Sequence, residues 1–340
     1  MERKNKLVDV AAAANVSTTT ISRYMNGSLH LSAKTQKRVD AAIENLSYMP
    51  DPRARRLSTG KSDTFALILP DIANPFFSKI AASIESAAAD AGYTVVLSAT
   101  FNEESREISA LELALQNKVA GVIFATNHKT GTLVAQLLNK FDRVVILDED
   151  VRETQAPKLR CDNVMGGELA GKYLREQGHK NVAYIGGGKD LLSTYSRLKG
   201  LENGLFPEGK RNDRPLKHYF GDHDIHSGKI LAKQFISEVK NETAIFVGSD
   251  ELTIGVLTAF KELDVKIPDE FSLISFDGVQ NFNLFQPAIT NVGQPVESLG
   301  KRAVEIILDN VRGRYEAGDY LELVPVTLNL ESSVINLKEI

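Results

Sequence analysis

The chain has 340 residues, a formal net charge of −4 and a single cysteine. This length is enough for several hydrophobic cores, and no run of 18 apolar residues is present that could span a bilayer. The lone Cys161 excludes an intrachain disulfide and is predicted to be a buried apolar filler. The first residues contain no apolar secretion segment, so we expect a cytoplasmic protein without a membrane partner.

Charge is distributed unevenly along the chain. Residues 1–61 hold eleven Lys or Arg against five Asp or Glu, a net charge of +6, which leaves −10 for the remainder. This asymmetry is typical of a basic nucleic-acid-binding module joined to an acidic body.

Two short helices are predicted at the start of the chain. Residues 7–14 carry apolar side chains at helical spacing, and Asn15, which tolerates the left-handed conformation, ends them. Residues 17–25 follow, with Ser17 as the N-cap and Ile21 on the inward face. The outward face of this second helix carries Thr18, Thr19, Ser22 and Arg23.

This pair of helices fits helix-turn-helix docking in a DNA major groove, where the second helix presents small polar residues to the bases. Arg23 can bond O6 and N7 of a guanine, while Thr18 or Thr19 can reach base edges. The alternative interpretation of this face is a solvated polar helix in an α-helical bundle. The basic charge of residues 1–61 favours DNA binding.

A third helix and a short basic segment complete the N-terminal region. The third helix is predicted at about residues 33–45, with basic side chains able to face phosphates. Asp51 followed by Pro52 is typical of a helix start, and Gly60 can end this short helix. Its central side chains are Arg53, Arg55, Arg56 and Leu57. Basic groups beside an apolar wedge suit insertion into a minor groove, although an ordinary basic linker is the alternative.

Four short motifs occur in order in this region: LVDVA at 7–11, VSTTTISR at 16–23, LSAKT at 31–35 and LSYMP at 46–50. Together they resemble the headpiece of the lactose-repressor (LacI) and purine-repressor family. The resemblance implies that Thr18, Thr19 and Arg23 read bases and that Leu57 enters the minor groove. It implies phosphate contacts at Ser17, Asn26, His30 and Thr35. Asn15 and Asp51 depart from the family pattern, because a turn glycine and an asparagine are usual there.

Strand and helix patterns alternate through the rest of the chain. Helical segments include 80–91 and 169–177. Short apolar runs typical of buried strands lie at 65–69, 94–97, 121–124, 144–147, 182–185, 244–247 and 273–276. The alternation predicts an α/β fold in which two lobes with parallel sheets meet at a cleft, as in periplasmic binding proteins.

We therefore expect three regions. An all-α headpiece occupies residues 1–50, a hinge helix and linker 51–62, and an effector-binding and dimerisation core 63–340. Within the core, the first lobe comprises roughly 63–161 plus 293–322, and the second lobe 162–292 plus 323–340.

The end of the first core strand supplies an aromatic pair to the expected cleft. Asp71 follows the strand, and Asn74 can cap a helix that begins at Pro75. Phe76 and Phe77 would project from the first helical turn, where they can stack on the C–H faces of a sugar ring. Packing within the lobe core is an equally good interpretation of either one.

Other strand ends supply polar groups. Arg197 has a planar fork that can bond two neighbouring hydroxyls at once, and carboxylates can do the same from the opposite side. These candidates are Asp148, Tyr195, Arg197, Ser249, Asp250 and Asp277. A solvated loop or a helix cap is the simpler interpretation of any single one. Together with the aromatic pair they favour a polyhydroxylated ligand.

The family resemblance extends over essentially the whole chain. It implies effector contacts at Arg197, Asp277, Asp148 and Gln294, and it places His223 where some relatives have an aromatic residue over the ligand. Ser249 departs from the asparagine that often stands there, which implies a changed hydroxyl pattern in the effector.

Catalysis is disfavoured. Gly186 to Gly188 follow a strand but lack the spacing of a dinucleotide-binding loop. His223 and His226 are interpreted as loop residues, and the histidines show no metal-ligand spacing. We therefore expect no enzyme, no cofactor and no metal.

The predicted function is a DNA-binding transcriptional regulator, a repressor of carbohydrate-utilisation genes controlled by a sugar or polyol. Its partners would be a near-palindromic double-stranded operator, the small-molecule effector and a second copy, because one headpiece reads only half a site. A helix at 298–311 can contribute to the homodimer interface. A transport receptor with the same cleft fold is the alternative.

Overall fold

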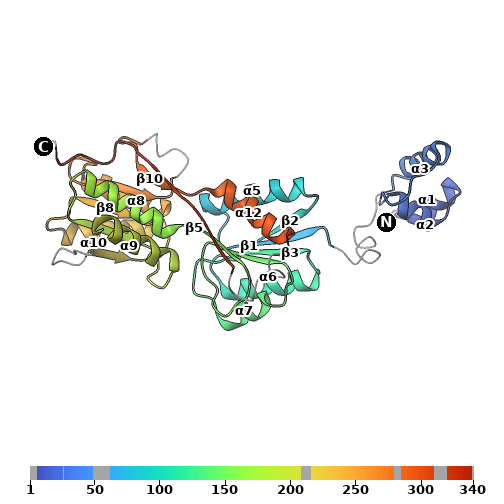
Figure 1. Ribbon diagram of the computed structural model, residues 1–340, viewed down its shortest axis with the longest axis horizontal. Coiled ribbons are helices and arrows are strands. Elements are labelled where there is room, and N and C mark those ends of the chain that lie inside the picture. The colour runs from blue at the N-terminus through green and yellow to red at the C-terminus, as the bar shows by residue number, and fades with distance from the viewer. Residues whose placement is uncertain are drawn as a thin grey trace. The chain divides into compact units, whose positions relative to one another are not determined.

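The computed structural model of the protein describes residues 6–25, 27–48, 62–207, 216–278, 285–309 and 320–338. It divides into two compact units, Met1–Ser62 and Asp63–Ile340 (Figure 1). The predicted hinge residues Asp51, Arg53, Arg56 and Leu57 lie outside the described residues, as does the predicted phosphate contact Asn26.

The first unit holds the three predicted helices, α1 (Leu7–Ala14), α2 (Thr18–Met25) and α3 (Ala33–Asn45). Val10, Ile21 and Val39, one from each helix, are fully buried and form its core. Asn15 ends α1 in the left-handed conformation with φ of 51°. The asparagine therefore adopts the backbone conformation that a glycine usually adopts at such a turn.

The first core lobe is a six-stranded sheet in the order β11-β5-β4-β3-β1-β2, in which all neighbours run parallel. Its strands are β1 (Thr64–Leu69), β2 (Thr94–Ala99), β3 (Gly121–Ala125), β4 (Val144–Leu147), β5 (Lys158–Cys161) and β11 (Leu321–Val324). Its helices are α5 (Pro75–Asp90), α6 (Glu104–Gln116), α7 (Thr132–Leu138) and α12 (Val296–Leu308). Alternate residues of β1 enter different cores: Leu67 packs with α5 and α12, and Ile68 packs with α6 and α7 (Figure 1).

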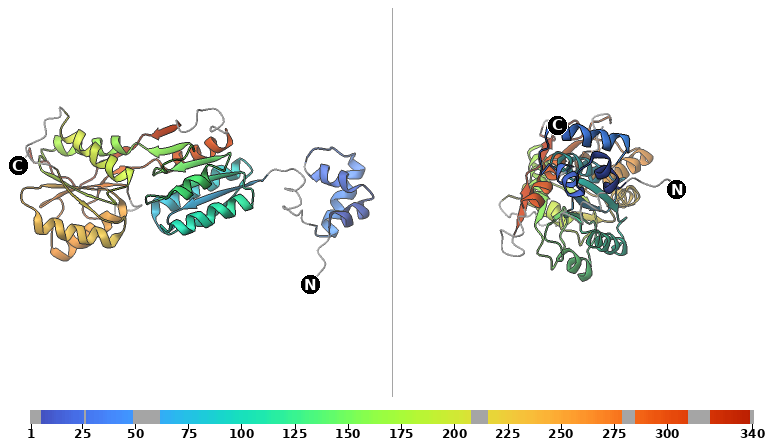
Figure 2. Two further views of the ribbon diagram at one scale, coloured as in Figure 1. Left: turned by 90° about the horizontal axis from the view of Figure 1, so that it is seen from below. Right: turned by 90° about the vertical axis from the view of Figure 1, so that its right-hand side faces the viewer.

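The second lobe repeats this plan in the order β12-β10-β9-β8-β6-β7, with only the β10–β12 pair antiparallel among the described strands. Its strands are β6 (Val182–Gly186), β7 (Lys217–Phe220), β8 (Ala244–Val247), β9 (Ser272–Phe276), β10 (Thr290–Gly293) and β12 (Thr327–Asn329). Its helices are α8 (Asn163–Glu176), α9 (Leu192–Leu205), α10 (Ile225–Glu238) and α11 (Asp250–Leu263). Both lobes are therefore sheets covered by helices on two faces, as Figure 2 shows from two further sides.

Three predicted helices differ at their ends from the observed ones. The predicted helix at 80–91 begins at Pro75, the one at 169–177 begins at Asn163, and the one at 298–311 ends at Leu308. The spacing of apolar residues predicts only those helical turns that face a core. The first residue of each helix is instead determined by capping side chains such as Asn74 and Asp162. Strand β11 also continues to Val324, past the lobe boundary expected at residue 322.

None of the helices in the described part of the chain combines the length and the apolar character needed to cross a bilayer.

His179 fastens the C-terminal segment to the second lobe. Its Nδ1 lies 2.8 Å from Thr243 Oγ1 and its Nε2 lies 3.1 Å from the carbonyl oxygen of Ile335. The side chain is 1% exposed, and burial lowers the pKa of the imidazole below its usual value. The folded protein therefore holds His179 neutral.

This burial predicts a pH dependence of stability. Because the folded pKa is lowered, the contribution of His179 is fully present above the unfolded pKa of about 6.5 and is lost as the pH falls through the folded value. His179→Gln cannot titrate, so the wild-type advantage in unfolding free energy should be constant above about pH 7 and shrink below about pH 6. Urea unfolding of both proteins across this range checks it, and an advantage independent of pH contradicts it.

Candidate DNA-binding face and effector cleft

The exposed side of α2 carries the predicted base-reading residues. Thr18, Thr19 and Arg23 are exposed, whereas Ser22 is half-buried. Ser17 Oγ accepts a hydrogen bond from the backbone N–H of Thr20 at 3.0 Å, so it caps α2 as predicted. Helix α2 thus presents two threonines of its first turn and an arginine of its last turn outward, as a helix that reads a major groove does.

The two predicted phosphate contacts on α3 and before it lie on the same unit. His30 is exposed, and Thr35 is half-buried beside Ser32, with the two hydroxyl oxygens 2.9 Å apart. Ser32 caps α3 by accepting from the N–H of Thr35. The cap directs the N-terminus of α3 outward, where backbone N–H groups favour a phosphate.

A cavity of about 730 Å³ lies between the carboxyl ends of the strands of the two core lobes. The first lobe contributes Asp71 and His128, and the second lobe contributes Asp190, His223 and Glu251. A smaller cavity of about 130 Å³ lies beside it. It is lined by Phe76, Asp250, Asp277 and Gln294, among others. Strand ends of parallel sheets are the usual place for a ligand in this kind of fold.

Arg197 is a buried cation near Asp148 and Asp277, and it lines neither of the two cavities. It comes from α9, is 4% exposed, and donates from Nε to Asn163 Oδ1 at 2.8 Å and from Nη1 to the carbonyl oxygen of Gly248 at 2.5 Å. Its guanidinium carbon lies 3.7 Å from the centre of the Phe276 ring. The guanidinium is therefore fixed by two hydrogen bonds and a ring face before any ligand arrives.

Two carboxylates follow strands in a strained conformation. Asp148 after β4 and Asp277 after β9 both have φ of 68°. Left-handed backbone at a non-glycine residue stores energy and is common at binding sites. Burial raises the pKa of Asp148 to about 6 and that of Asp277 to about 7. Gln294 donates from Nε2 to Asp277 Oδ2 at 2.6 Å, while its Oε1 is buried without a partner in the described structure.

Ser249 and Asp250 form the start of α11. The Ser249 hydroxyl accepts from the N–H of Leu252 at 3.3 Å, and Asp250 Oδ1 accepts from the N–H of Glu251 at 2.8 Å. Ser249 is thus engaged as a helix cap. Asp250 is 3% exposed and still lines the smaller cavity with its remaining atoms.

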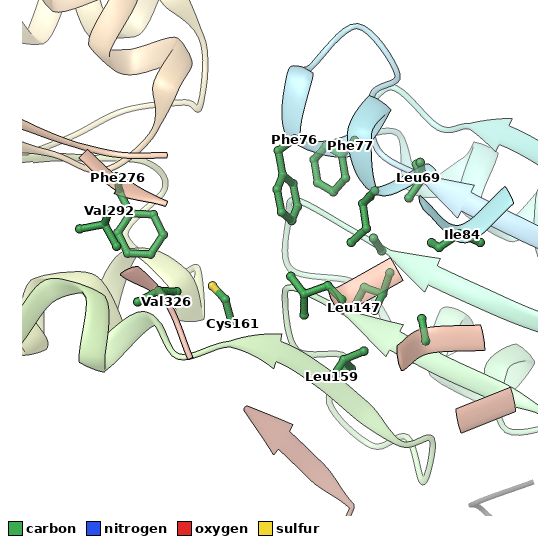
Figure 3. Close-up of a cluster of buried hydrophobic side chains, with 14 of the residues drawn as sticks. Leu69, Phe76, Phe77, Ile84, Leu147, Leu159, Cys161, Phe276, Val292 and Val326 are labelled. Atoms are coloured by element: carbon green, nitrogen blue, oxygen red, sulfur yellow. The ribbon is translucent and has the colours of Figure 1, made fainter. Parts of the chain in front are cut away.

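Of the two aromatic residues, one lies where it can contact a ligand and the other packs in the lobe core. Phe76 and Phe77 are 9% and 5% exposed, and their ring centres lie 5.0 Å apart at an edge-to-face angle of 69°. Figure 3 shows both on the first lobe, on the side that faces Phe276 and Val292 of the second lobe. Phe76 lines the smaller cavity and Phe77 lines neither of the two. Asn74 caps α5 as predicted, accepting from the N–H of Phe76 and of Phe77.

Two other predicted residues are placed differently from expectation. Tyr195 is 60% exposed and lines neither cavity, so the structure does not bring it together with Arg197 at the cleft. His226 lies in the first turn of α10, not in a loop, because Asp224 caps that helix. Cys161 is buried as predicted, and burial raises the pKa of its thiol.

His223 is a neutral wall of the larger cavity. Burial and the positive charge of Arg197 lower the pKa of its imidazole to about 3. Its Nε2 lies 3.5 Å from Thr194 Oγ1, and the ring lies against Gly187, where a Cβ atom would meet Nε2 at 1.9 Å. Only glycine at 187 leaves room for this ring.

Sequence reasoning missed Glu149 and Asn163. Glu149 follows β4 in the first lobe, is 3% exposed, and accepts hydrogen bonds from the N–H groups of Leu192 at 2.9 Å and Ser193 at 3.1 Å. These groups form the N-terminus of α9 in the second lobe. The carboxylate therefore joins the two lobes by capping a helix of one from a loop of the other.

Removing this interlobe cap has a defined expected result. Glu149→Ala leaves two helix N–H groups unpaired, so the free energy of unfolding of the ligand-free protein should fall by roughly 1–2 kcal/mol. Chemical unfolding measures the loss, and the radius of gyration in solution scattering should rise as the lobes separate. Glu112→Ala, at an exposed position of α6, is the matched control. Equal stability and equal radius for both variants would contradict the interlobe role.

The site geometry defines a DNA-binding module followed by a two-lobed small-molecule receptor. Two family models match: bacterial regulatory proteins of the lacI family over residues 6–51, and periplasmic binding proteins and sugar binding domain of LacI family over residues 62–328. The chain belongs to the LacI family of bacterial regulators.

Its relatives are transcriptional regulators. The chain is 30% identical to the HTH-type transcriptional repressor PurR of Edwardsiella ictaluri over 93% of both chains. It is 29% identical to the repressor CytR of Escherichia coli over 90% of both. Among solved structures, the lac repressor dimer bound to operator and an anti-inducer matches with a TM-score of 0.86 and 26% identity, covering 98% of this chain and 100% of that one. The CelR–cellobiose complex matches with a TM-score of 0.72 and 25% identity, covering 97% and 99%.

Proposed function

We propose that the protein represses carbohydrate-utilisation genes by binding a near-palindromic operator as a homodimer, under the control of a sugar or polyol bound between its core lobes. The observation that carries this proposal is Arg197, a buried guanidinium held by Asn163, Gly248 and Phe276. It lies near the carboxylates Asp148 and Asp277 in a core that follows a helix-turn-helix unit. The matched lac repressor is a dimer on operator, and the matched CelR structure holds cellobiose. Because it acts on DNA, the protein works in the cytoplasm.

The effector acts through its preference for one arrangement of the lobes. Cleft closure changes the spacing of the segments that lead to the two headpieces of a dimer, and hence whether both can sit in successive major grooves. The effector can change operator affinity only by its differential affinity for the two arrangements, typically about 1–3 kcal/mol.

Selection of tight-binding sequences from random DNA tests the proposal. The expected product is a near-palindrome whose half-sites are about one helical turn apart, or a multiple of that spacing. The affinity for this operator should then change when sugars or polyols are added. Enrichment of no sequence, or an operator affinity that no sugar or polyol alters, would refute the proposed function.

Arg23→Ala is expected to relax the reading of one base position. Loss of a bidentate contact to guanine should cost about 1–3 kcal/mol at the preferred operator and little at operators mutated in that base. Competition binding against single-base variants of the selected operator measures this. Lys34→Ala on α3 is the control, since loss of a phosphate contact weakens all sequences alike and reduces the salt dependence. A uniform loss for Arg23→Ala would place Arg23 on a phosphate.

A further inference from the structure

We infer that the effector carries no anionic group: the cleft takes an uncharged polyhydroxylated ligand and rejects its phosphate esters and carboxylates. This inference rests on the proposed function, because it specifies the ligand class of the same cleft. It follows from the charges that face the cavities and from the partners that already occupy them.

The cleft is lined by more carboxylates than cations. The larger cavity has Asp71, Glu251 and three exposed aspartates of the second lobe against the exposed lysines Lys129 and Lys189 and against His128, whose ring is paired with the buried Glu107. The smaller cavity has Asp250 and Asp277 against Lys79. An added phosphate would bring negative charge into a region that is already acidic.

The carboxylates already repel one another. After burial, the largest cause, the negative charge of Glu149 raises the pKa of Asp148, and that of Asp250 raises the pKa of Asp277. Burial raises the pKa of Glu251 to about 7, with Asp250 and Asp71 adding to it. When a second anion contacts these groups, either one of the carboxylates takes up a proton or the binding free energy is reduced by charge repulsion.

The buried cation Arg197 is already engaged. Arg197 donates to Asn163 and Gly248, and its plane lies on Phe276, so part of its fork is no longer free for a phosphate. Bidentate phosphate recognition needs two adjacent free N–H groups of one guanidinium. The side-on pair that contains Nε–H is thereby closed to a phosphate, and the remaining N–H groups suit ligand hydroxyls, which accept one hydrogen bond and donate another to a carboxylate.

One backbone anion site at the cleft is filled from inside the protein. The N-terminus of α9 presents the N–H groups of Leu192 and Ser193, which would otherwise favour a phosphate. Glu149 occupies both at 2.9 and 3.1 Å. An anionic ligand must therefore displace a buried carboxylate to reach the only helix N-terminus seen paired across the lobes in the described structure.

An unsatisfied acceptor remains at the smaller cavity. Gln294 Oε1 is buried with no partner in the described structure, and Asp277 uses one oxygen for the Gln294 amide. A ligand hydroxyl can donate to either of them, whereas a phosphate dianion has no proton to donate. These acceptors favour an uncharged ligand that has several neighbouring hydroxyl groups.

Matched pairs of probes test the inference on the full-length dimer. D-ribose, D-glucose and D-fructose are compared with ribose 5-phosphate, glucose 6-phosphate and fructose 6-phosphate, and D-glucose also with gluconate, by isothermal titration and by operator affinity. At least one neutral probe is expected to bind, and to bind at least about 100-fold more tightly than its anionic counterpart. A phosphate ester or gluconate that binds as tightly as the neutral sugars overturns the inference but leaves the proposed function standing, provided that it changes operator affinity. Binding by none of the neutral probes overturns the inference as well.

Glu149→Gln supplies the matched variant. It removes one negative charge and frees part of the α9 N-terminus. The ratio of the affinity of the parent sugar to that of its phosphate ester, here called the handicap, should therefore shrink at least about 10-fold. Glu112→Gln, exposed on α6, should leave the handicap unchanged. An equal handicap in wild type and Glu149→Gln would show that the internal carboxylate does not exclude anions, and would overturn the inference in this form.

Discussion

Arg197→Ala is expected to abolish the response of operator affinity to the effector while leaving operator binding itself near that of the wild type. The guanidinium is the buried cation of the cleft, and its removal takes away the donor that a ligand hydroxyl would meet beside Asp277 and Asp148. Each lost hydrogen bond to a charged group is worth about 1.5–3 kcal/mol, so effector affinity should fall by at least 10-fold. Operator titrations with and without effector measure the response.

The same substitution should also lower stability. Asn163 Oδ1 and the carbonyl oxygen of Gly248 lose their donor, and leaving each buried acceptor unpaired costs roughly 1–3 kcal/mol. Binding is therefore measured well below the melting temperature of the variant. Asn163→Ala, which removes only the Nε partner, should give a weaker version of both effects. Arg175→Ala, at an exposed position of α8, is the control for loss of an arginine. A normal effector response in Arg197→Ala would refute the assignment of the cleft.

Much of the fold could be predicted because the physical signals are local. Alternation of apolar runs with helical periods predicts two parallel sheets, and Asn15, Ser17 and Asn74 end or begin helices as their side-chain chemistry predicts. Strands β5 and β11 gave no such signal, because each is short and contains charged residues. Lys158, Arg160 and Glu322 interrupt the apolar run that a buried strand usually shows.

The site could be predicted only in part, because its key contacts join distant segments. Strand-end position predicts Asp148 and Asp277 at the cleft, whereas Gln294 follows only from the family resemblance. Nothing in the sequence around Glu149 shows that it will cap α9, since the partner amides lie beyond β5 and α8 in the chain. The roles of Ser249 and Phe77, as cap and core residue, follow from packing that no single-sequence pattern determines.

Helices α8 and α9 meet backbone to backbone, and this contact holds Arg197 in position. Gly167 and Gly171 on α8 face Gly200 and Gly204 on α9, and at each of the four a Cβ atom would lie 2.1–2.4 Å from a backbone oxygen of the facing helix. Asn163 is on α8 and Arg197 is on α9, so their 2.8 Å hydrogen bond depends on the same close approach. The glycines thus link packing of the second lobe to the geometry of the cleft.

Gly200→Ala is therefore expected to destabilise the protein although it improves helix propensity. On propensity alone, alanine in a helix interior gains about 1 kcal/mol over glycine. At residue 200 its Cβ would lie 2.1 Å from the carbonyl oxygen of Val164 and 2.8 Å from the N of Glu168. Both are backbone atoms, which cannot move aside by a change of rotamer as a side chain can. Overpacking of this kind costs about 3 kcal/mol or more, so the sign of the change reverses.

Urea unfolding and effector titration together decide whether the predicted clash exists. Gly200→Ala should lower the unfolding free energy by roughly 2 kcal/mol net and weaken effector binding, because α9 must move away from α8 and carry Arg197 with it. Lys199→Ala, at the adjacent exposed position of α9, is the matched control. Stabilisation by Gly200→Ala would mean that helix propensity outweighs packing and that the helices have room to spare. The position of Arg197 would then have to be set by Asn163, Gly248 and Phe276 alone.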